Sequence, residues 1–331
     1  MRTARLKASP ESPVAYYHCI SRVVDRRFIF GPEEKDHFVH LMRLYEAFCG
    51  VHVLTYVVMS NHFHILVEVP QRPAVMPPDE VLLTRLEHLH NADYADNVRA
   101  LLSSMTSDQV RQHLEGYWKR MHDISWFIRM IKQRFSQWHN LRQERVGTLW
   151  EERFKSVLVE GAGDVLAAMA AYIDLNPVRA GLVEDPKGYR WCGFGEAIAG
   201  STLARRGIQL VMNGLNKRKW EHALHGYRVY LFGQADEVRG HGGIPTERVD
   251  QIVAAKGALP MAEYLRCRVR YFADGVVLGS REYVESVFND QRQRFGKRRK
   301  SGPRRVRWLE DARLFTLRDL KREGLAGAGG V

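Results

Sequence analysis

The sequence predicts an α+β fold, namely a ferredoxin-like antiparallel sheet with helices on one face, followed by a helical C-terminal region. Two patterns support this prediction. Over residues 14–159, runs rich in β-branched and aromatic residues alternate with amphipathic stretches in the order strand, helix, strand, strand, helix, strand. That order is typical of the split β-α-β arrangement. Beyond about residue 200, short helical patterns dominate.

Each element of that order has its own signal. The first strand is expected at residues 14–23, and Pro32 is expected to open a helix that ends near Gly50. Residues 56–69 form two apolar runs around the turn-forming Ser60-Asn61, which predicts a strand pair. The remaining elements are a helix at 125–142, an extended segment at 147–159, a helix at 164–175 that ends before Pro177, and helices at 220–232, 248–256 and 261–272 and from Ser280.

These elements predict three regions in the chain. Residues 1–195 form the main domain, with a helical insertion at about 71–121 that is rich in proline at its start. Residues 200–290 form a helical region. Residues 291–331 form a basic tail, whose first part, 291–307, holds nine Lys or Arg and no acidic residue.

The bulk composition is that of a basic globular protein. The chain has 331 residues and a formal net charge of +12, which favours nucleic acid as a partner. The four cysteines show no Cys-x-x-Cys spacing, so neither a zinc ribbon nor a disulfide framework is expected. No apolar run is long enough to span a bilayer, and we expect a cytoplasmic protein without a membrane partner.

His62 and His64 begin the second strand of the predicted pair. Residues two apart on a strand point to the same face, so both imidazoles project side by side and can share one divalent metal. A buried histidine pair without a metal is the alternative interpretation. A second His-X-His, at His88 and His90, lies in a helical stretch, where residues two apart diverge by about 200°. We expect no site there.

Tyr172 and Asn176 lie four residues apart and therefore share one face of a helix. If this helix packs beside the histidine strand, a phenol, an amide oxygen and two imidazoles converge. The three neutral ligands would leave open positions on Mg²⁺ or Mn²⁺, and Tyr172 would attack a phosphodiester. The alternative is an ordinary amphipathic helix with Asn176 as its C-terminal cap.

Three segments of the chain resemble the HUH single-tyrosine transposases, particularly the REP-associated tyrosine transposases. They are YVVMSNHFH at 56–64, GTLWEERFKS at 147–156 and YIDLNPVRAGLV at 172–183. The resemblance implies a ferredoxin-like nuclease domain that cleaves and rejoins single-stranded, hairpin-forming DNA such as REP-like palindromes through a covalent phosphotyrosine. By position it implies that His62 and His64 bind the metal, that Asn176 is the third ligand, and that Tyr172 is the nucleophile. The region at 200–290 resembles the C-terminal extension of longer family members, which implies a DNA-binding helical module there.

Further residues are candidates for DNA contacts, as phosphate-binding cations or, for the tryptophan, as a stacking surface. They are Arg129, Lys132, Arg134, Trp150, Arg153, Lys155 and Arg179. The alternative for each is a solvated basic face or, for Trp150, a place in the core. We expect a monomer or a homodimer. A non-catalytic DNA-binding protein derived from a transposase is the alternative function, and a hydrolase that uses activated water is a third.

Overall fold

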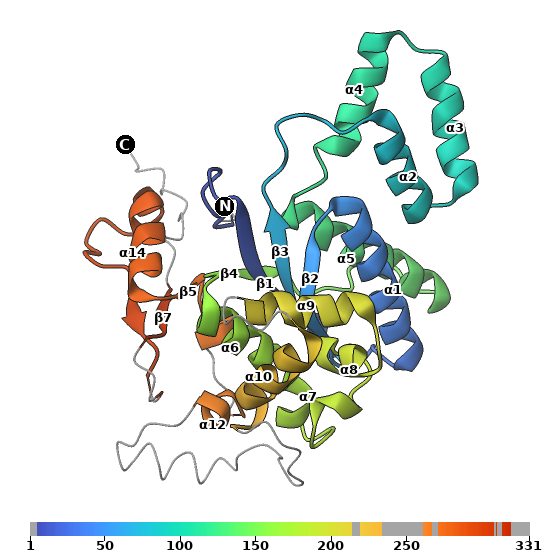
Figure 1. Cartoon of the computed structure of the whole chain (residues 1–331). Helices are drawn as coiled ribbons and strands as arrows, with labels where there is room; N and C mark the ends of the chain where they lie inside the picture. Colours follow the sequence, from blue (N-terminus) through green and yellow to red (C-terminus); the bar gives the residue numbers. More distant parts are fainter. Residues whose placement is uncertain are drawn as a thin grey trace, which may run out of the picture.

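A computed structural model describes residues 5–213, 219–233, 261–266, 271–307, 309 and 313–318. Within these residues the chain forms one seven-stranded sheet with helices on both of its faces (Figure 1). The helix expected at 248–256 and the end of the predicted basic tail lie outside the described residues. No helix in the described part of the chain is both long enough and apolar enough to cross a membrane.

The first four strands form the predicted ferredoxin-like unit. They are β1 (Val14–Arg22), β2 (His52–Val58), β3 (His62–Pro70) and β4 (Lys155–Val159). Their spatial order is β2-β3-β1-β4, and all three pairs are antiparallel. The register sets Ile20 opposite His64 and Arg22 opposite His62, so the histidines begin a central strand. The α+β prediction and this strand order are confirmed.

The two helices of that unit cover one face of the sheet. They are α1 (Pro32–Cys49) and α5 (Ile124–Arg142), and they bury an aromatic cluster that includes Phe38, Phe63 and Phe135. Helix α1 begins at a proline and ends at Gly50, which adopts φ 64°. This left-handed conformation is typical of the glycine that terminates a helix.

The other face is also covered, which corrects the prediction of helices on one face only. Helix α6 (Gly163–Asp174) is apolar on every side, and α8 (Gly193–Ile198), α9 (Thr202–Asn213) and α10 (Trp220–Phe232) pack beside it. Leu54, Val57 and Leu66 of the sheet contribute to this second core. A helix that is hydrophobic all round is buried on all sides, and α6 fits that rule.

Residues 71–121 form three helices that stand apart from the sheet in Figure 1. They are α2 (Asp79–Leu89), α3 (Ala92–Ser103) and α4 (Ser107–Trp118), in agreement with the predicted helical insertion. Arg72 ties the start of this insertion to its end, because its guanidinium donates to the carbonyls of Lys119 and Met121.

The C-terminal region adds three short strands, which we did not expect in a helical region with a basic tail. Strand β5 (Val277–Gly279) pairs parallel with β4, followed by β7 (Phe315–Leu317) and β6 (Arg304–Arg305). The remaining elements are α7 (Asn176–Arg179), α12 (Met261–Arg266), α13 (Tyr271–Asp274), α14 (Arg281–Asp290) and the 3₁₀ turns Val24–Arg26, Pro186–Gly188 and Arg292–Arg294. The sheet therefore extends beyond β4, and the apolar side chains at 277, 278 and 317 are buried in this extension.

Candidate metal and tyrosine site

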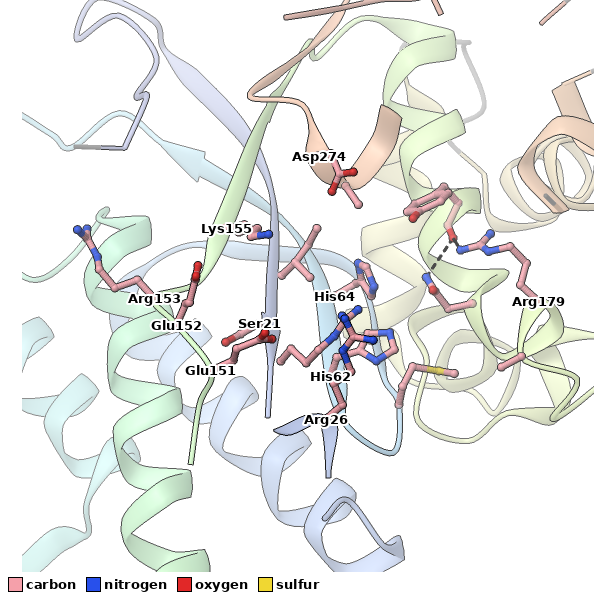
Figure 2. Close-up of a pocket in the computed structure, with 17 residues that line it drawn as sticks. Ser21, Arg26, His62, His64, Glu151, Glu152, Arg153, Lys155, Arg179 and Asp274 are labelled. Atoms are coloured by element: carbon pink, nitrogen blue, oxygen red, sulfur yellow. Dashed lines mark hydrogen bonds between the residues drawn. The ribbon is translucent and has the colours of Figure 1, made fainter. Parts of the chain in front are cut away.

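A cleft of about 800 Å³ lies where β1 ends, β3 begins and α6 runs into α7 (Figure 2). It is lined by Ile20, Ser21, Arg22, Arg26, Met59, His62, His64, Glu151, Glu152, Arg153, Lys155, Tyr172, Asn176, Arg179, Ala180, Ala273 and Asp274. The proposed ligands His62, His64 and Asn176 and the proposed nucleophile Tyr172 all belong to this lining. The structure therefore brings these four sequence-predicted residues together.

The histidine pair has the geometry expected of a strand. The ring centroids of His62 and His64 are 5.2 Å apart, and the side chain of Phe63 between them is buried among the aromatic residues of the opposite face. The helical pair differs. His88 Nδ1 donates to the carbonyl of Thr84, four residues before it, while the ring of His90 packs at a tilt against that of Tyr94.

Each histidine of the cleft uses its Nδ1 atom in a hydrogen bond. His62 Nδ1 lies 2.7 Å from Asn61 Oδ1, and the Asn61 amide group donates to the carbonyl of Arg26. His64 Nδ1 lies 2.8 Å from Nε2 of His18, a buried histidine in β1. Neither Nε2 atom of the pair takes part in these contacts. Both are therefore placed to offer lone pairs to a metal.

Both histidines are held in the neutral form that metal binding requires. Burial is the largest cause, followed by the charge of Arg22, and together they lower the pKa of His62 to about 4. Burial also lowers the pKa of His64 well below its ordinary value, reinforced by His18, His62 and Arg179. At neutral pH neither imidazole carries a proton that would compete with a metal.

Asn176 is the candidate for the third ligand. Its amide nitrogen donates to the carbonyls of Tyr172 and Ile173, at 3.2 Å and 3.0 Å, which fixes the orientation of the amide. The Oδ1 atom is not used in these bonds. Within the described residues no cluster of three or more His, Cys, Asp or Glu could hold a metal, so a site here depends on Asn176. Two imidazole nitrogens and an amide oxygen fit a divalent cation that keeps open positions.

Tyr172 is packed tightly at the edge of the cleft. Its ring stacks on Phe272 with centroids 4.8 Å apart, and it lies 6.2 Å from the ring of His64. Only 7% of its surface is exposed. Burial raises the pKa of the phenol, the positive charge of Arg179 partly offsets this, and Asp274 adds to the increase. The phenol is therefore protonated at neutral pH in the metal-free protein.

Arg179 lies over the ring of Tyr172. Its guanidinium carbon is 4.3 Å from the centroid of the Tyr172 ring, and its two terminal nitrogens donate to the carbonyls of Leu265 and Tyr172. Of the other candidates for phosphate contacts, Arg153 and Lys155 are exposed and line the same cleft, and Figure 2 shows them across the histidine pair from Arg179.

The other candidates for DNA contacts lie elsewhere. Arg129 and Arg134 are exposed on α5 outside the cleft, and Arg134 donates to the hydroxyl of Tyr45 beside the insertion. Lys132 and Trp150 are each only 8% exposed. The indole nitrogen of Trp150 donates to the carbonyl of Lys132 and to Ser136. A buried ring cannot stack on a base, so the structure supports the core interpretation of Trp150.

Four residues of the site were not anticipated from the sequence: His18, Arg22, Arg26 and Asp274. Alternation along β1 was a usable signal for the first two, because His18, Ile20 and Arg22 share a face with the histidines of β3. Asp274 comes from α13, a hundred residues beyond Tyr172, and no local pattern connects it to the cleft.

Comparisons with known proteins agree with the first part of this picture. Residues 12–77 match the model of the family described as IS200-like transposases, and this span includes β1, α1, β2 and the histidine strand β3. The expected resemblance to the tyrosine transposases is thereby confirmed over these residues. The match ends before Tyr172. No curated protein matches the chain.

A solved structure is similar to part of the chain. It is that of a REP-associated tyrosine transposase bound to a REP hairpin, and it has 14% sequence identity to this chain and a TM-score of 0.37. The match covers 56% of this chain and 80% of that one. A likeness at this level supports no conclusion about the present chain.

Proposed function

We propose that this protein is a metal-dependent tyrosine transposase that cleaves and rejoins single-stranded, hairpin-forming DNA through a covalent phosphotyrosine. The observation that carries the proposal is the convergence of His62, His64, Asn176 and Tyr172 on one cleft from separate elements. The IS200-like match over residues 12–77 supports the transposase class. Hairpin DNA, including REP-like palindromes, is the substrate implied by the resemblance of the sequence.

In this proposal, His62, His64 and Asn176 hold a Mg²⁺ or Mn²⁺ ion. Imidazole nitrogen prefers softer ions than water or carboxylate oxygen does, so the two histidines favour Mn²⁺ over Mg²⁺. When bound, such an ion supplies charge stabilisation on a phosphoryl oxygen and fixes the orientation of the scissile bond. The remaining chemistry belongs to the side chains of the chain itself.

Tyr172 supplies the nucleophile. Its phenol oxygen forms a bond to phosphorus while the bond from phosphorus to one sugar oxygen breaks. The phenol proton leaves, and the departing sugar oxygen takes up a proton as a hydroxyl. Because the phosphotyrosine retains a phosphodiester-like bond, attack by another DNA hydroxyl rejoins the strand without ATP. Arg179, 4.3 Å above the ring, favours the phenolate over the phenol.

The cations of the cleft hold the DNA backbone in this proposal. Arg22, Arg26, Arg153, Lys155 and Arg179 line the cleft together with three acidic residues, so cations predominate. Contacts of this kind fix the position of the strand but carry no sequence information. Binding should weaken as salt concentration rises, because each neutralised phosphate releases counterions.

The test uses a hairpin-forming DNA strand with Mg²⁺ or Mn²⁺, analysed on denaturing gels. The proposal predicts a protein–DNA adduct that is lost in Tyr172→Phe. Tyr94→Phe, in the insertion, is the matched control and should retain the adduct, because Tyr94 lies outside the cleft. Cleavage that persists in Tyr172→Phe would contradict the proposal and favour a hydrolase that uses activated water.

A non-catalytic DNA-binding protein is the second candidate, and the burial of Tyr172 favours it. A phenol that is only 7% exposed and stacked on Phe272 must become accessible before it can attack DNA. DNA binding without an adduct, with every divalent metal tried, would select this candidate.

The proposal covers a monomer or a homodimer. The site is either built within one subunit or shared between two. Mixing Tyr172→Phe with His64→Ala subunits distinguishes these arrangements, because activity returns only if the tyrosine of one subunit acts at the metal site of its partner.

A further inference from the structure

A third histidine lies behind the pair and has no role in the proposed reaction. His18, in the middle of β1, has no exposed surface. Its ring stacks against that of His64 with centroids 5.0 Å apart, and both of its ring nitrogens are engaged. Nδ1 lies 2.9 Å from the carbonyl oxygen of Phe272, and Nε2 lies 2.8 Å from Nδ1 of His64. A buried, fully paired polar residue beside a site needs a reason.

The positions of the protons follow from these contacts. A carbonyl oxygen only accepts, so Nδ1 of His18 must carry the hydrogen and donate it to Phe272. His18 has no exposed surface, and its two contacts are a carbonyl oxygen and a second imidazole, neither of which would balance a positive charge. A buried charge without a counter-charge is costly, so the ring is neutral and its Nε2 accepts. His64 must then donate from its Nδ1. In a neutral ring this leaves the Nε2 atom of His64 without a hydrogen.

We propose that His18 is a positioning residue that holds His64 in the tautomer needed for metal binding, with its Nε2 lone pair directed at the cleft. The carbonyl of Phe272 sets the proton position and ring orientation of His18. His18 in turn sets those of His64, whose Nε2 is the ligand atom. Metal-binding histidines commonly donate their other ring N–H to a neighbouring acceptor, which sets tautomer and ring orientation. Here that acceptor is another imidazole. The inference rests on the metal site of the proposed function.

The same geometry excludes His18 as a metal ligand itself. Its Nε2 faces His64 and its Nδ1 faces a carbonyl, so neither nitrogen is available. His62 reaches the same tautomer by a separate route, since its Nδ1 donates to the side-chain Oδ1 of Asn61. The two ligands are therefore oriented independently, and loss of His18 should affect His64 alone.

Phe272 links this arrangement to the C-terminal region. It lies 254 residues beyond His18, and its side chain stacks on Tyr172 while its carbonyl accepts from His18. One residue of the C-terminal region thus contacts both the nucleophile and the residue that orients a ligand. The span that matches the IS200-like transposase model, 12–77, contains His18 and His64 but not Phe272, whose carbonyl accepts from His18.

The direct test measures the tautomer of His64 by ¹⁵N NMR in histidine-labelled, metal-free protein at neutral pH. Protonated and unprotonated ring nitrogens give well-separated signals, and His64→Gln assigns those of His64 by their loss. The wild type should show hydrogen on Nδ1 alone. In His18→Leu the acceptor is gone, and the Nε2–H form of His64 should appear. A wild-type His64 with hydrogen on Nε2, or a His18→Leu variant with an unchanged tautomer, would overturn the inference.

The second measurement is Mn²⁺ affinity by calorimetry, without DNA. His18→Leu should weaken binding by about 10–100-fold, the range for residues that support a ligand. His18→Gln retains an acceptor and a donor and should recover part of that loss. His139→Leu is the matched control, because His139 is also a buried histidine but lies in α5 outside the cleft. It should leave Mn²⁺ affinity unchanged.

These results separate the two proposals. Equal losses in His18→Leu, His18→Gln and His139→Leu would mean that general destabilisation is responsible, and the role of His18 would be wrong. A wild type that binds Mn²⁺ and shows the expected tautomer but forms no DNA adduct would instead remove the proposed function and leave the role of His18 standing.

Discussion

The two faces of the central sheet differ in the side chains that they present. Along β3, Phe63, Ile65 and Val67 point toward α1 and α5 and are completely buried in an aromatic and aliphatic core. The alternate residues, His64 and Leu66, point toward α6 on the other face. One strand therefore supplies packing to one side and a candidate ligand to the other. Neighbouring residues of β3 therefore belong to different faces, one to the core and the next to the candidate site.

On the face toward α6, hydrogen bonds compensate three buried ionisable groups for lost hydration. His18, His64 and Asp174 are at most 4% exposed, and each has named partners. The opposite face has its own buried cation, Lys132, whose ammonium group donates to the carbonyl of Glu152. If the two faces are as separate as this comparison indicates, substitutions on one should alter chemistry and those on the other should alter stability.

The largest effect is expected from His64→Ala, which removes a candidate ligand from the face toward α6. A metal at a phosphoryl oxygen contributes several kcal/mol to the transition state, so cleavage should fall by about a thousand-fold or more. The fraction of DNA cleaved with saturating protein measures this. The free energy of unfolding of the metal-free protein should change far less.

The helical histidine pair provides the control for that prediction. His88→Ala with His90→Ala removes the same two side chains from exposed positions on and after α2. Cleavage and unfolding should both stay close to the wild type. If this double variant lost as much cleavage as His64→Ala, the strand geometry of His62 and His64 would not be what matters.

Much of the site could be predicted because its geometry is local. Strand alternation places His62 and His64 side by side, and helical spacing places Tyr172 and Asn176 on one face, whatever the rest of the chain does. The convergence of the two elements depends on tertiary packing, and for that the resemblance to a known family was needed. His18 was not identified, because its role appears only when β1 pairs with β3 and Phe272 returns from the far end of the chain.

The fold was predictable to a similar extent. The strand and helix order follows from periodicity up to residue 159, and the structure has it. The second helical layer was not foreseen, because the apolar sequence of α6 does not indicate which face of a sheet it will cover. The C-terminal strands are two or three residues long, too short to leave a periodic pattern.

The next largest effect should come from Trp150→Ala on the face toward α5. Trp150 packs against Phe63 with ring centroids 5.6 Å apart and hydrogen-bonds into α5, so its loss should cost about 3–5 kcal/mol of unfolding free energy. Chemical denaturation measures it. Phe28→Ala is the control, because Phe28 is 82% exposed and should cost little. Full stability with weakened DNA binding would instead restore the stacking role predicted from the sequence.

Asp174, which is buried on the face toward α6, should make the unfolding free energy depend on pH. Burial raises the pKa of this carboxyl to about 7, although Tyr227, Thr55 and the Phe194 amide donate to it. The unfolded pKa is about 3.9, so between these values the folded state binds more protons than the unfolded state. The contribution of Asp174 is therefore fully present below about pH 4 and is lost as pH rises toward 7.

Asp174→Asn should remove that slope. The unfolding free energy of the variant relative to the wild type should rise between pH 4 and pH 7 by up to about 4 kcal/mol, since each pKa unit corresponds to about 1.4 kcal/mol. Denaturation curves at several pH values measure the difference. A difference that stays flat across this range would show that the carboxylate is stable in its charged form and that burial on this face is less costly than we infer.

The smallest effect tests how closely the second layer approaches the sheet. Gly207 of α9 lies against β2, and a Cβ atom there would fall well inside contact distance of the Leu54 carbonyl oxygen. Backbone atoms cannot move aside as a flexible side chain can, so Gly207→Ala should cost about 1–3 kcal/mol of unfolding free energy.

Gly116 of α4 has nothing within 4 Å of the same added atom. Gly116→Ala should instead stabilise the protein by up to about 1 kcal/mol, because alanine is the better helix former. Opposite signs at two helical glycines would confirm that α9 is fixed on the sheet by backbone contact, while the insertion is packed loosely enough to accept a methyl group. If Gly207→Ala were neutral, α9 and the helices packed on it could shift against β2. Tyr172 and His64 would then be held in place by the sheet and the C-terminal segment alone.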